Sequence, residues 1–534
     1  MTSPKPPHKT TLPRRAGVLL PLFSVQTTHD WGVGEIPDLI PLAEWAHRAG
    51  LSVLQLLPVN QVASGETSPY AAATAFALDP VYLGIDRLED FAGSGGRARL
   101  SSLERQELDT LAEQERIRWP TVRRLKEKAF DQAFAWFYEK EWRTGSSRRK
   151  ALEAFREQHR DWLEDHALFT VLHAREKKAW WQWPEPLRRR DTAALDKLRE
   201  SAFMDVLKVH YLQWLADEQW HAARREANAL GVALKGDLPF MVGADSADVW
   251  SASENFRLDR RVGTPPDAFS ETGQDWGLPA YDWERLEKSG FAWLRARAER
   301  SGSLFDLYRI DHVIGLYRTY TRAADGPEDA GFSPEKEKDQ IRLGETILEL
   351  FKGYGEVVAE DLGMVPEFLP PSLEKLGIPG YRVLRWQMGK DGEIQDPETW
   401  PELSVATTGT HDLEPNADWY DALSKKEKKA FLRLPTLAHL DPAGSFTDGV
   451  RDALLETVYG AASELAINPL QDLLGRRERV NVPGTVTDSN WTYRMRPTLS
   501  ELGGNRAIRD RLLELSLRTR RFRVMPIEQT AESM

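Results

Sequence analysis

Residues 304–312 read LFDLYRIDH, and two later segments follow the same pattern, GEVVAEDLG at 355–363 and LSVATTGTHD at 403–412. In each segment a run of apolar and β-branched residues, typical of a buried strand, ends at a carboxylate. The three carboxylates are Asp311, Glu360 and Asp412. Because reactive side chains lie at the C-terminal ends of the strands in an α/β barrel, the segments predict a barrel whose acids share one site.

Further apolar runs bounded by Gly or Pro predict other strands that are covered on both faces. They span 16–22, 52–58, 231–238 and 380–385, with 480–487 as a further candidate. Between such runs, apolar residues recur at helical spacing, for example over 37–49 and 339–352. Alternating strands and helices imply a parallel sheet, and eight strands suggest closure. The predicted fold class is therefore α/β, a (β/α)8 TIM barrel with large helical insertions between barrel strands.

The predicted strands divide the chain unevenly. Residues 1–14 are polar and Pro-rich and predict a flexible tail, which leaves 15–534 for the catalytic barrel. Within the barrel, 85–226 is charged and helical in pattern and predicts an inserted, mainly helical subdomain. Residues 240–300 are rich in Gly, Pro and Trp and predict a lid or substrate-loop insertion, with a long loop at 263–283. The alternative for that loop is a structural Ω-loop.

The composition excludes several classes of function. The 71 basic and 82 acidic residues give a net charge of −11, which argues against a nucleic-acid partner and against an anionic membrane surface. The chain has no cysteine, which excludes disulfides and thiolate zinc sites and is consistent with the reducing cytoplasm. It contains no His-x-x-x-His pattern, so we expect neither a metal nor a cofactor. We further expect a monomer.

Asp311 lies in the sequence Arg309-Ile310-Asp311-His312. Side chains alternate along a strand, so Arg309 and Asp311 are expected on one face. A guanidinium lowers the pKa of a neighbouring carboxyl, which would leave Asp311 ionised, as a nucleophile must be. The alternative is a structural Arg–Asp ion pair.

Glu360 and Asp412 suggest two further functions. Glu360 follows an apolar strand and lies near other carboxylates, so its pKa should be raised and it could act as a general acid. The alternative is that it caps the next helix. Asp412, with His411 beside it, could bind sugar hydroxyls and stabilise positive charge on a sugar ring. For His411 the alternatives are a core histidine or a metal ligand, and no ligand cluster supports the metal.

Several motifs occur together in the order and spacing of one known family. They are AGVLLPLFS at 16–24, SPYAAATAFALDP at 68–80, GDLPF at 236–240, DSADVW at 245–250, PPDAFSETGQDWG at 265–277, RIDH, EDLG and GTHD at the strand ends, PLQDLLG at 469–475, and NVPGTV followed by NW at 481–491. On these motifs the sequence resembles the amylomaltases, 4-alpha-glucanotransferases (disproportionating enzymes) of the α-amylase superfamily. The resemblance extends from about residue 16 to about residue 500.

The resemblance implies functions for residues at matching positions. It makes Asp311 the nucleophile, Glu360 the acid–base and Asp412 the stabiliser of the transition state. It implies substrate-binding functions for a larger set of residues: Arg309, His312, His411, Asp237, Asp245, Ser68, Tyr70, Gln274 and Trp276. The chain departs from the family pattern at Leu413-Glu414-Pro415, where Asn-Asp-Thr is usual, and at Leu278, where Asn is usual.

The resemblance also implies an activity. It predicts transfer of α-1,4-glucan segments from a donor to the 4-hydroxyl of an acceptor glucan or glucose, by a retaining double displacement. The expected partners are malto-oligosaccharides and glucans of the starch or glycogen type. The alternatives are an α-glucan hydrolase of the amylase kind and a non-catalytic glucan-binding protein. Three intact carboxylates argue against the second, because a binding protein has no need for an acid beside a nucleophile.

Overall fold

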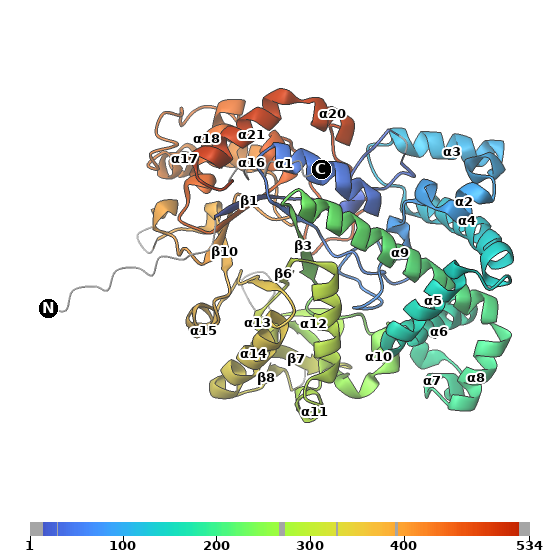
Figure 1. The fold of residues 1–534 in the computed structure, drawn as a ribbon. Helices are drawn as coiled ribbons and strands as arrows, with labels where there is room; N and C mark the ends of the chain where they lie inside the picture. The colour runs from blue at the N-terminus through green and yellow to red at the C-terminus, as the bar shows by residue number, and fades with distance from the viewer. Residues whose placement is uncertain (1–13, 29, 266–272, 327–328, 390–392, 523–534) are drawn as a thin grey trace, which may run out of the picture.

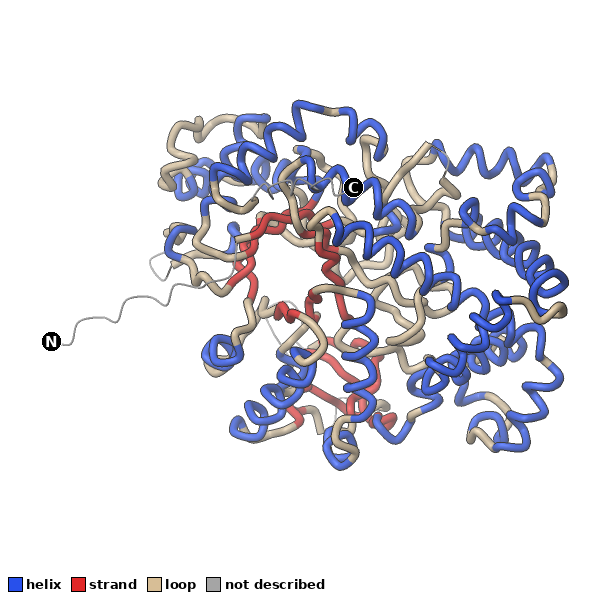
Figure 2. The backbone as a smooth tube through the Cα atoms, viewed as in Figure 1, coloured by secondary structure: helices blue, strands red, loops and turns tan. Residues whose placement is uncertain are grey.

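The computed structural model describes residues 14–28, 30–265, 273–326, 329–389 and 393–522. In these residues eight parallel strands close into a barrel, seen as the central ring of strands in Figure 2. They are β1 (Arg15–Leu19), β2 (Val53–Gln55), β3 (Ala233–Leu238), β6 (Leu307–Ile310), β9 (Glu356–Ala359), β10 (Gly380–Val383), β11 (Ser404–Thr407) and β12 (Leu465–Pro469). Around the ring their order is β1-β12-β11-β10-β9-β6-β3-β2. The predicted (β/α)8 fold class is confirmed.

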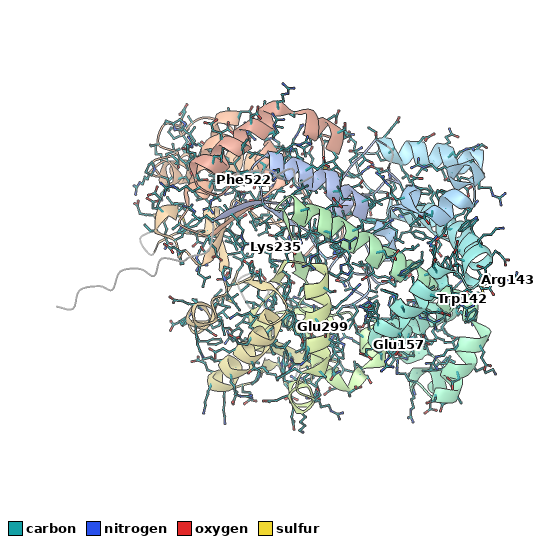
Figure 3. All side chains as sticks on the ribbon, viewed as in Figure 1. Trp142, Arg143, Glu157, Lys235, Glu299 and Phe522 are labelled. Carbon is teal, nitrogen blue, oxygen red and sulfur yellow. The ribbon has the colours of Figure 1, made fainter. Side chains whose placement is uncertain are left out.

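The barrel strands are apolar because each has both faces covered, one by helices and one by the barrel interior. All residues of β2, β6, β11 and β12 are buried. The interior also holds Lys235, which Figure 3 places inside the ring and which is 0% exposed. Its Nζ donates to Gln55 Oε1 of β2 at 3.0 Å and to Tyr381 Oη of β10 at 2.9 Å. A buried amine needs such acceptors, because an unsatisfied polar group in the interior is costly.

The prediction of a strand at 480–487 is wrong, and the eighth strand is β12, which was not predicted. Residues 480–487 contain Pro483, which lacks an N–H for pairing, and Gly484, whose φ is 71°. They form an irregular loop with a turn at 483–484 instead. Strand β12 reads LAINP and runs directly into helix α19 (Leu470–Leu474), so its apolar residues merge with the helical pattern in the sequence.

Helices surround the barrel (Figure 1). The helices predicted over 37–49 and 339–352 are confirmed as α1 (Leu39–Arg48) and α14 (Glu337–Lys352). Other helices of the barrel part are α12 (Ala292–Leu304), α13 (Ile314–Tyr317), α15 (Leu369–Leu376), α16 (Asn416–Ala422), α17 (Lys425–Phe431), α18 (Asp448–Gly460), α20 (Leu499–Gly504) and α21 (Arg506–Arg518). Among the described residues, none of the helices combines the length and apolar character needed to cross a membrane.

The helices that follow β2 and precede β3 in the chain form a group on one side of the barrel (Figure 1). It comprises α2 (Glu89–Gly93), α3 (Ser102–Glu113), α4 (Trp119–Phe137), α5 (Ser147–Gln158), α6 (Arg160–Glu176), α7 (Glu185–Arg188), α8 (Thr192–Ser201) and α9 (Phe203–Ala229). The last of these packs on α1 and β3 and so returns the chain to the barrel. The limits of this insertion, 85–226, stay a prediction.

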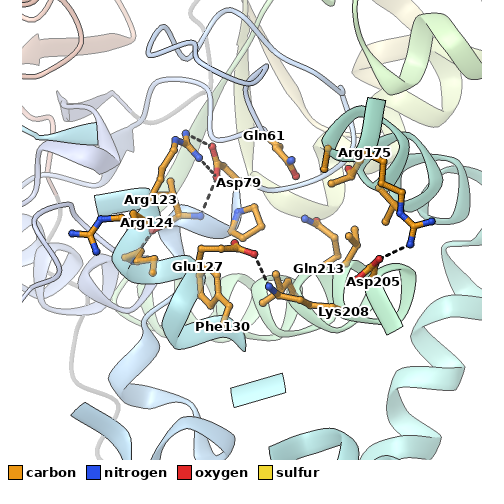
Figure 4. Close-up of a pocket in the computed structure, with 18 residues that line it drawn as sticks. Gln61, Asp79, Arg123, Arg124, Glu127, Phe130, Arg175, Asp205, Lys208 and Gln213 are labelled. Atoms are coloured by element: carbon orange, nitrogen blue, oxygen red, sulfur yellow. Dashed lines mark hydrogen bonds and ion pairs between the residues drawn. The ribbon is translucent and has the colours of Figure 1, made fainter. Parts of the chain in front are cut away.

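A cleft of about 640 Å³ lies within this group of helices, between α4, α6 and α9 (Figure 4). Its cations are paired: Arg123 with Asp79, Arg175 with Asp205 and Lys208 with Glu127. None of the described residues that line the cleft is one of the three strand-end acids. The cleft is therefore separate from the acids at the barrel.

Four antiparallel strands form a second, smaller sheet in the order β5-β4-β7-β8. They are β4 (Phe256–Thr264), β5 (Gln274–Tyr281), β7 (Thr319–Ala323) and β8 (Gly331–Ser333). The long loop predicted at 263–283 is wrong for residues 274–281, because these pair with β4. Gly277 and Pro279 suggested a loop, yet β5 is an edge strand, where a proline is tolerated. Residues 266–272, and the predicted tail except Arg14, lie outside the described residues.

Candidate active site at the C-terminal end of the barrel

Asp311 and Glu360 lie on adjacent strand ends. Strand β6 ends at Ile310 and β9 ends at Ala359, and these two residues pair in register. The Glu360 N–H donates to Ile310 O at 3.0 Å, and the His312 N–H donates to Glu360 Oε2 at 2.7 Å. Because neighbouring strands lie about 4.8 Å apart, the register makes the two acids neighbours at this end of the barrel.

Arg309 is the buried cation of the site, with an exposure of 4%. Its Nε donates to Asp237 Oδ1 at 2.8 Å, and its Nη2 donates to Asp311 Oδ1 at 2.6 Å. The Nη2 group also lies 3.2 Å from the Tyr70 hydroxyl. A charge is retained in the interior only when it is paired and hydrogen-bonded, and two carboxylates meet that requirement here.

Tyr70 joins the acids of β3 and β6 to the loop that follows β11. Its hydroxyl donates to Asp237 Oδ2 at 2.7 Å and lies 2.9 Å from His411 Nε2. The phenol has a single proton, so if Asp237 accepts it, His411 Nε2 must carry a hydrogen and act as the donor. The two rings also stack, with centroids 5.3 Å apart and planes inclined by 16°. Burial lowers the pKa of His411, which keeps it neutral.

Burial raises the pKa of both central carboxyls. It raises the pKa of Asp311 to about 8, although Arg309 opposes the shift. The lowered pKa predicted for Asp311 is therefore wrong in direction, because desolvation exceeds the effect of the guanidinium. Burial likewise raises the pKa of Glu360. The two acids together thus retain a proton at neutral pH. Arg309, which donates to Asp311, opposes the rise in the pKa of Asp311 and also that of Glu360.

Asp412 lies five residues beyond the end of β11, on a loop. Asn481 Nδ2 donates to its Oδ1 at 2.6 Å, and Arg479 Nη2 donates to its backbone carbonyl at 2.7 Å. His411 Nε2 lies 3.3 Å from its Oδ2. Sequence reasoning did not assign a function to Asn481 or Arg479. The only signal was the position of Asn481 at the start of the NVPGTV motif.

His312 and Trp276 form one wall of the site. The Trp276 ring meets the His312 ring edge-on, with centroids 5.0 Å apart, so strand β5 reaches the acids. Trp276 Nε1 donates to Gln274 Oε1 at 3.2 Å. His312 has a φ of 46°, a strained conformation of the kind that clusters at functional sites. Burial lowers its pKa to about 4, so it is neutral.

Two of the predicted substrate-binding residues contribute differently. The Ser68 hydroxyl accepts the Tyr70 N–H at 3.3 Å, so it supports the turn that carries Tyr70. Asp245 bonds to the helical insertion, accepting from His173 Nε2 at 2.8 Å and from the Trp180 N–H at 3.0 Å. Within the described ranges, no group of three or more acids or histidines is arranged to hold a metal ion.

Comparison with known proteins gives the following similarities. A family profile described as 4-alpha-glucanotransferase matches residues 20–500. The 4-alpha-glucanotransferase of Chlamydia pneumoniae is 32% identical over 501 residues, covering 91% of this chain and 92% of that protein. The Thermus thermophilus 4-alpha-glucanotransferase is 34% identical over 502 residues, covering 91% and 95%. The solved amylomaltase from Streptococcus agalactiae, in complex with acarbose, superimposes with a TM-score of 0.82 at 26% identity, covering 96% of this chain and all of that one.

Proposed function

This chain belongs to the 4-alpha-glucanotransferase family. We propose that Asp311 and Glu360 are its two catalytic carboxyl groups, the nucleophile and the acid–base. The chain is a glycosyltransferase that moves α-1,4-glucan segments from a donor to an acceptor. The assignment of its catalytic residues is supported by the pairing of Ile310 with Ala359, which brings the two acids together. Retaining chemistry needs carboxyl groups about 5–5.5 Å apart, a spacing that adjacent strand ends allow.

In the first step, a carboxylate oxygen of Asp311 attacks the anomeric carbon of the donor sugar. The bond from that carbon to the 4-oxygen of the next sugar breaks, and Glu360 gives its proton to the departing oxygen. The freed glucan leaves, and the remaining segment is held as an ester on Asp311. This step requires a proton on Glu360, which the raised pKa of that carboxyl supports, and a negative charge on Asp311, which the bond from Arg309 supports.

In the second step, the 4-hydroxyl of an acceptor glucan binds where the first fragment left. Glu360, now ionised, takes the hydroxyl proton while the oxygen attacks the anomeric carbon and displaces Asp311. Two inversions restore the α configuration, so the product is again an α-1,4 bond. Both carboxyls end in the protonation states in which they began.

Asp412 and His411 stabilise the transition state. Positive charge develops on the sugar ring, and a carboxylate that binds the ring hydroxyls binds this charged ring more tightly than the ground state. Asp412 has a side chain that is 40% exposed and so remains open to a sugar. We assign binding of the donor segment to the other polar and aromatic side chains: Arg309, His312, His411, Asp237, Ser68, Tyr70, Gln274, Trp276 and Asp245.

Transfer requires the acceptor to react in place of water. Well-oriented groups reach effective concentrations of about 10⁵ M or more, far above that of water, so an occupied acceptor site favours transfer. Trp386, 47% exposed just beyond β10, offers an apolar ring at the end of that strand. We assign a covering function to residues 240–300 and a shielding function to the insertion at 85–226.

The remaining expectations stay proposals. The enzyme acts on α-glucans, and within that class we propose malto-oligosaccharides and chains of the starch or glycogen type as its substrates. We propose that it works as a monomer in the cytoplasm, a placement supported by the absence of cysteine. The excess of acidic residues supports independence from nucleic acid and anionic membranes.

Incubation with maltotriose tests both the activity and the nucleophile. We expect a ladder of longer glucans at a constant count of reducing ends, because transfer creates one bond for each bond broken. A rising count would identify a hydrolase. Asp311→Ala should abolish the ladder while thermal unfolding and glucan binding persist, and turnover like that of the wild type in this variant would reject Asp311 as nucleophile.

A further inference from the structure

The loop that carries Asp412 needs help from elsewhere in the chain to hold that side chain in place. Asp311 and Glu360 directly follow barrel strands, whereas Asp412 lies five residues past Thr407, the last residue of β11. Its side chain is 40% exposed, so packing alone does not fix its orientation. Hydrogen bonds from other segments must therefore set the direction of its carboxylate.

Residues 479–481 supply such bonds from a distance of almost seventy positions in the chain. Asn481 is 8% exposed, and its side-chain amide donates to Asp412 Oδ1 at 2.6 Å. Arg479 Nη2 donates to the Asp412 carbonyl at 2.7 Å, and Arg479 Nε donates to the Asn481 carbonyl at 3.0 Å. Arg479 thus ties the two segments together at the backbone, while Asn481 holds one oxygen of the carboxylate.

Glu414 lies behind this arrangement, between two guanidinium groups. Its Oε1 accepts from Arg385 Nη1 at 2.9 Å, and its Oε2 lies 3.9 Å from Arg479 Nη1. Arg385 is 9% exposed and also lies over the Trp419 ring, 4.7 Å from its centroid. The Arg385–Glu414 pair is therefore anchored in the protein, and its carboxylate attracts Arg479 to the position from which Arg479 reaches Asp412.

We propose that Asn481 and Arg479 are positioning residues for Asp412, and that Glu414 keeps Arg479 in place. This inference rests on the function proposed above for Asp412. Asn481 holds Oδ1, whereas His411 Nε2, 3.3 Å from Oδ2, directs its hydrogen to Tyr70, so the amide of Asn481 fixes the carboxylate on one side. The Asp412 side chain is 40% exposed, so its oxygens remain accessible to sugar hydroxyls. The Asn481 amide donates to Asp412, and we assign its effect to that bond.

The size of the effect follows from the geometry of catalysis. A group displaced by about 1 Å from its productive position can cost on the order of 10²-fold in rate. Asn481→Ala removes the bond that holds Oδ1, so kcat for transfer from maltotriose should fall about 10–100-fold. The donor KM should change less than kcat, because the transition state depends on the orientation of Asp412 more than the ground state does.

Asn481→Asp provides a second readout, the pH dependence of kcat, which would not change if Asn481 only stabilised the fold. The introduced carboxyl would lie against Asp412 Oδ1, and once both carboxyls are ionised at high pH they repel each other and turn the Asp412 carboxylate away. At low pH the protonated carboxyl can donate an O–H to Oδ1 and replace the amide. We therefore expect the ratio of variant to wild-type kcat to rise at least tenfold from pH 8 to pH 5, whereas the ratio for Asn481→Ala should stay constant.

Arg479 and Arg477 form a matched pair for the second test. Arg477 lies two positions away, is more exposed than Arg479, and pairs with Asp418 and Asp421 at 2.6 Å. We expect Arg479→Gln to lower kcat about tenfold and Arg477→Gln to leave it unchanged, with both variants folded by circular dichroism. Glu414→Gln should lower kcat by about threefold to tenfold, less than Arg479→Gln, because Glu414 acts on Asp412 only through Arg479.

The outcomes separate this inference from the function on which it rests. Asp412→Asn serves as the reference. If Asp412→Asn is inactive but Asn481→Ala and Arg479→Gln keep wild-type kcat, the positioning inference is overturned and the function of Asp412 stands. A pH-independent ratio for Asn481→Asp also overturns the inference. If Asp412→Asn itself turns over like the wild type, both the function assigned to Asp412 and the inference fall.

Discussion

Replacing Arg309 with Met removes the only cation that contacts both Asp237 and Asp311 among the described residues. The guanidinium is 4% exposed and donates to the two carboxylates at 2.8 and 2.6 Å. Burial already raises the pKa of Asp311, and Arg309 is the first influence that opposes the rise. The variant should therefore hold Asp311 in its protonated form, in which it cannot attack a sugar. The pKa of Glu360 would rise as well, but this should not impair the first step, because Glu360 acts there in its protonated form.

The expected shift can be worked from Coulomb's law. Two unit charges about 4 Å apart interact by about 4 kcal/mol at an effective dielectric constant of about 20. Since one pKa unit corresponds to about 1.36 kcal/mol, the pKa of Asp311 should rise by about 2–3 units. At neutral pH the ionised fraction, and with it kcat/KM, should fall on the order of 10²–10³-fold.

The assay is the initial rate of transfer from maltotriose between pH 5.5 and pH 9.5. The kcat/KM of the wild type should level off near pH 8, whereas that of the variant, with a pKa about 2–3 units higher, should still be rising about tenfold per pH unit at pH 9.5. Arg297→Met is the control, because Arg297 is 5% exposed and bonds to the Phe240 carbonyl and the Tyr281 hydroxyl. It should lose stability without moving the pH profile. An Arg309→Met enzyme with an unshifted profile would refute the electrostatic function given to Arg309.

Three further predictions concern the neighbours of Arg309. Glu360→Gln should lower kcat on maltotriose about 10²–10⁴-fold but much less on α-maltotriosyl fluoride, whose leaving group needs no proton; equal losses on both donors would contradict the acid function. Tyr70→Phe removes the hydroxyl that contacts Asp237 and Arg309 at 2.7 and 3.2 Å, and kcat should fall roughly tenfold at nearly unchanged melting temperature. Asp311→Asn tests the raised pKa through stability. A pKa of about 8 in the folded state, against about 4 unfolded, means that the wild type loses stability as pH rises between those values. The variant does not, so its stability relative to wild type should grow from pH 5 to pH 8, by at most about 1.4 kcal/mol per pH unit. A pH-independent difference in thermal melts would contradict the shift.

Seven barrel strands could be predicted from the sequence because each is buried on both faces and so forms a continuous apolar run. The eighth could not. Strand β12 is five residues long and runs into a helix, so its pattern merges with that of the helix, whereas residues 480–487 resemble a strand in composition but contain a proline and a turn glycine. Strand β5 was missed because Gly277 and Pro279 normally interrupt strands, and only its place at the edge of a sheet accommodates them.

The acids of the site were recognisable because each follows a strand. Their supports were not. Asn481 and Arg479 approach Asp412 from another loop, and a contact between such distant positions leaves no pattern in a single sequence. The pKa of Asp311 could not be predicted from the sequence either. The sequence reveals the neighbouring Arg309, but the degree of burial, which outweighs that neighbour, depends on the whole fold.

Trapping the glycosyl-enzyme tests the central claim most directly. Glu360→Gln incubated with α-maltotriosyl fluoride should form the ester quickly and lose it slowly, because the base that activates an acceptor is missing. Tandem mass spectrometry of the digested protein should then locate a maltotriosyl group on the carboxyl of Asp311. A group on Asp237 or Asp412, or product of inverted configuration with no group on the protein, would contradict the account.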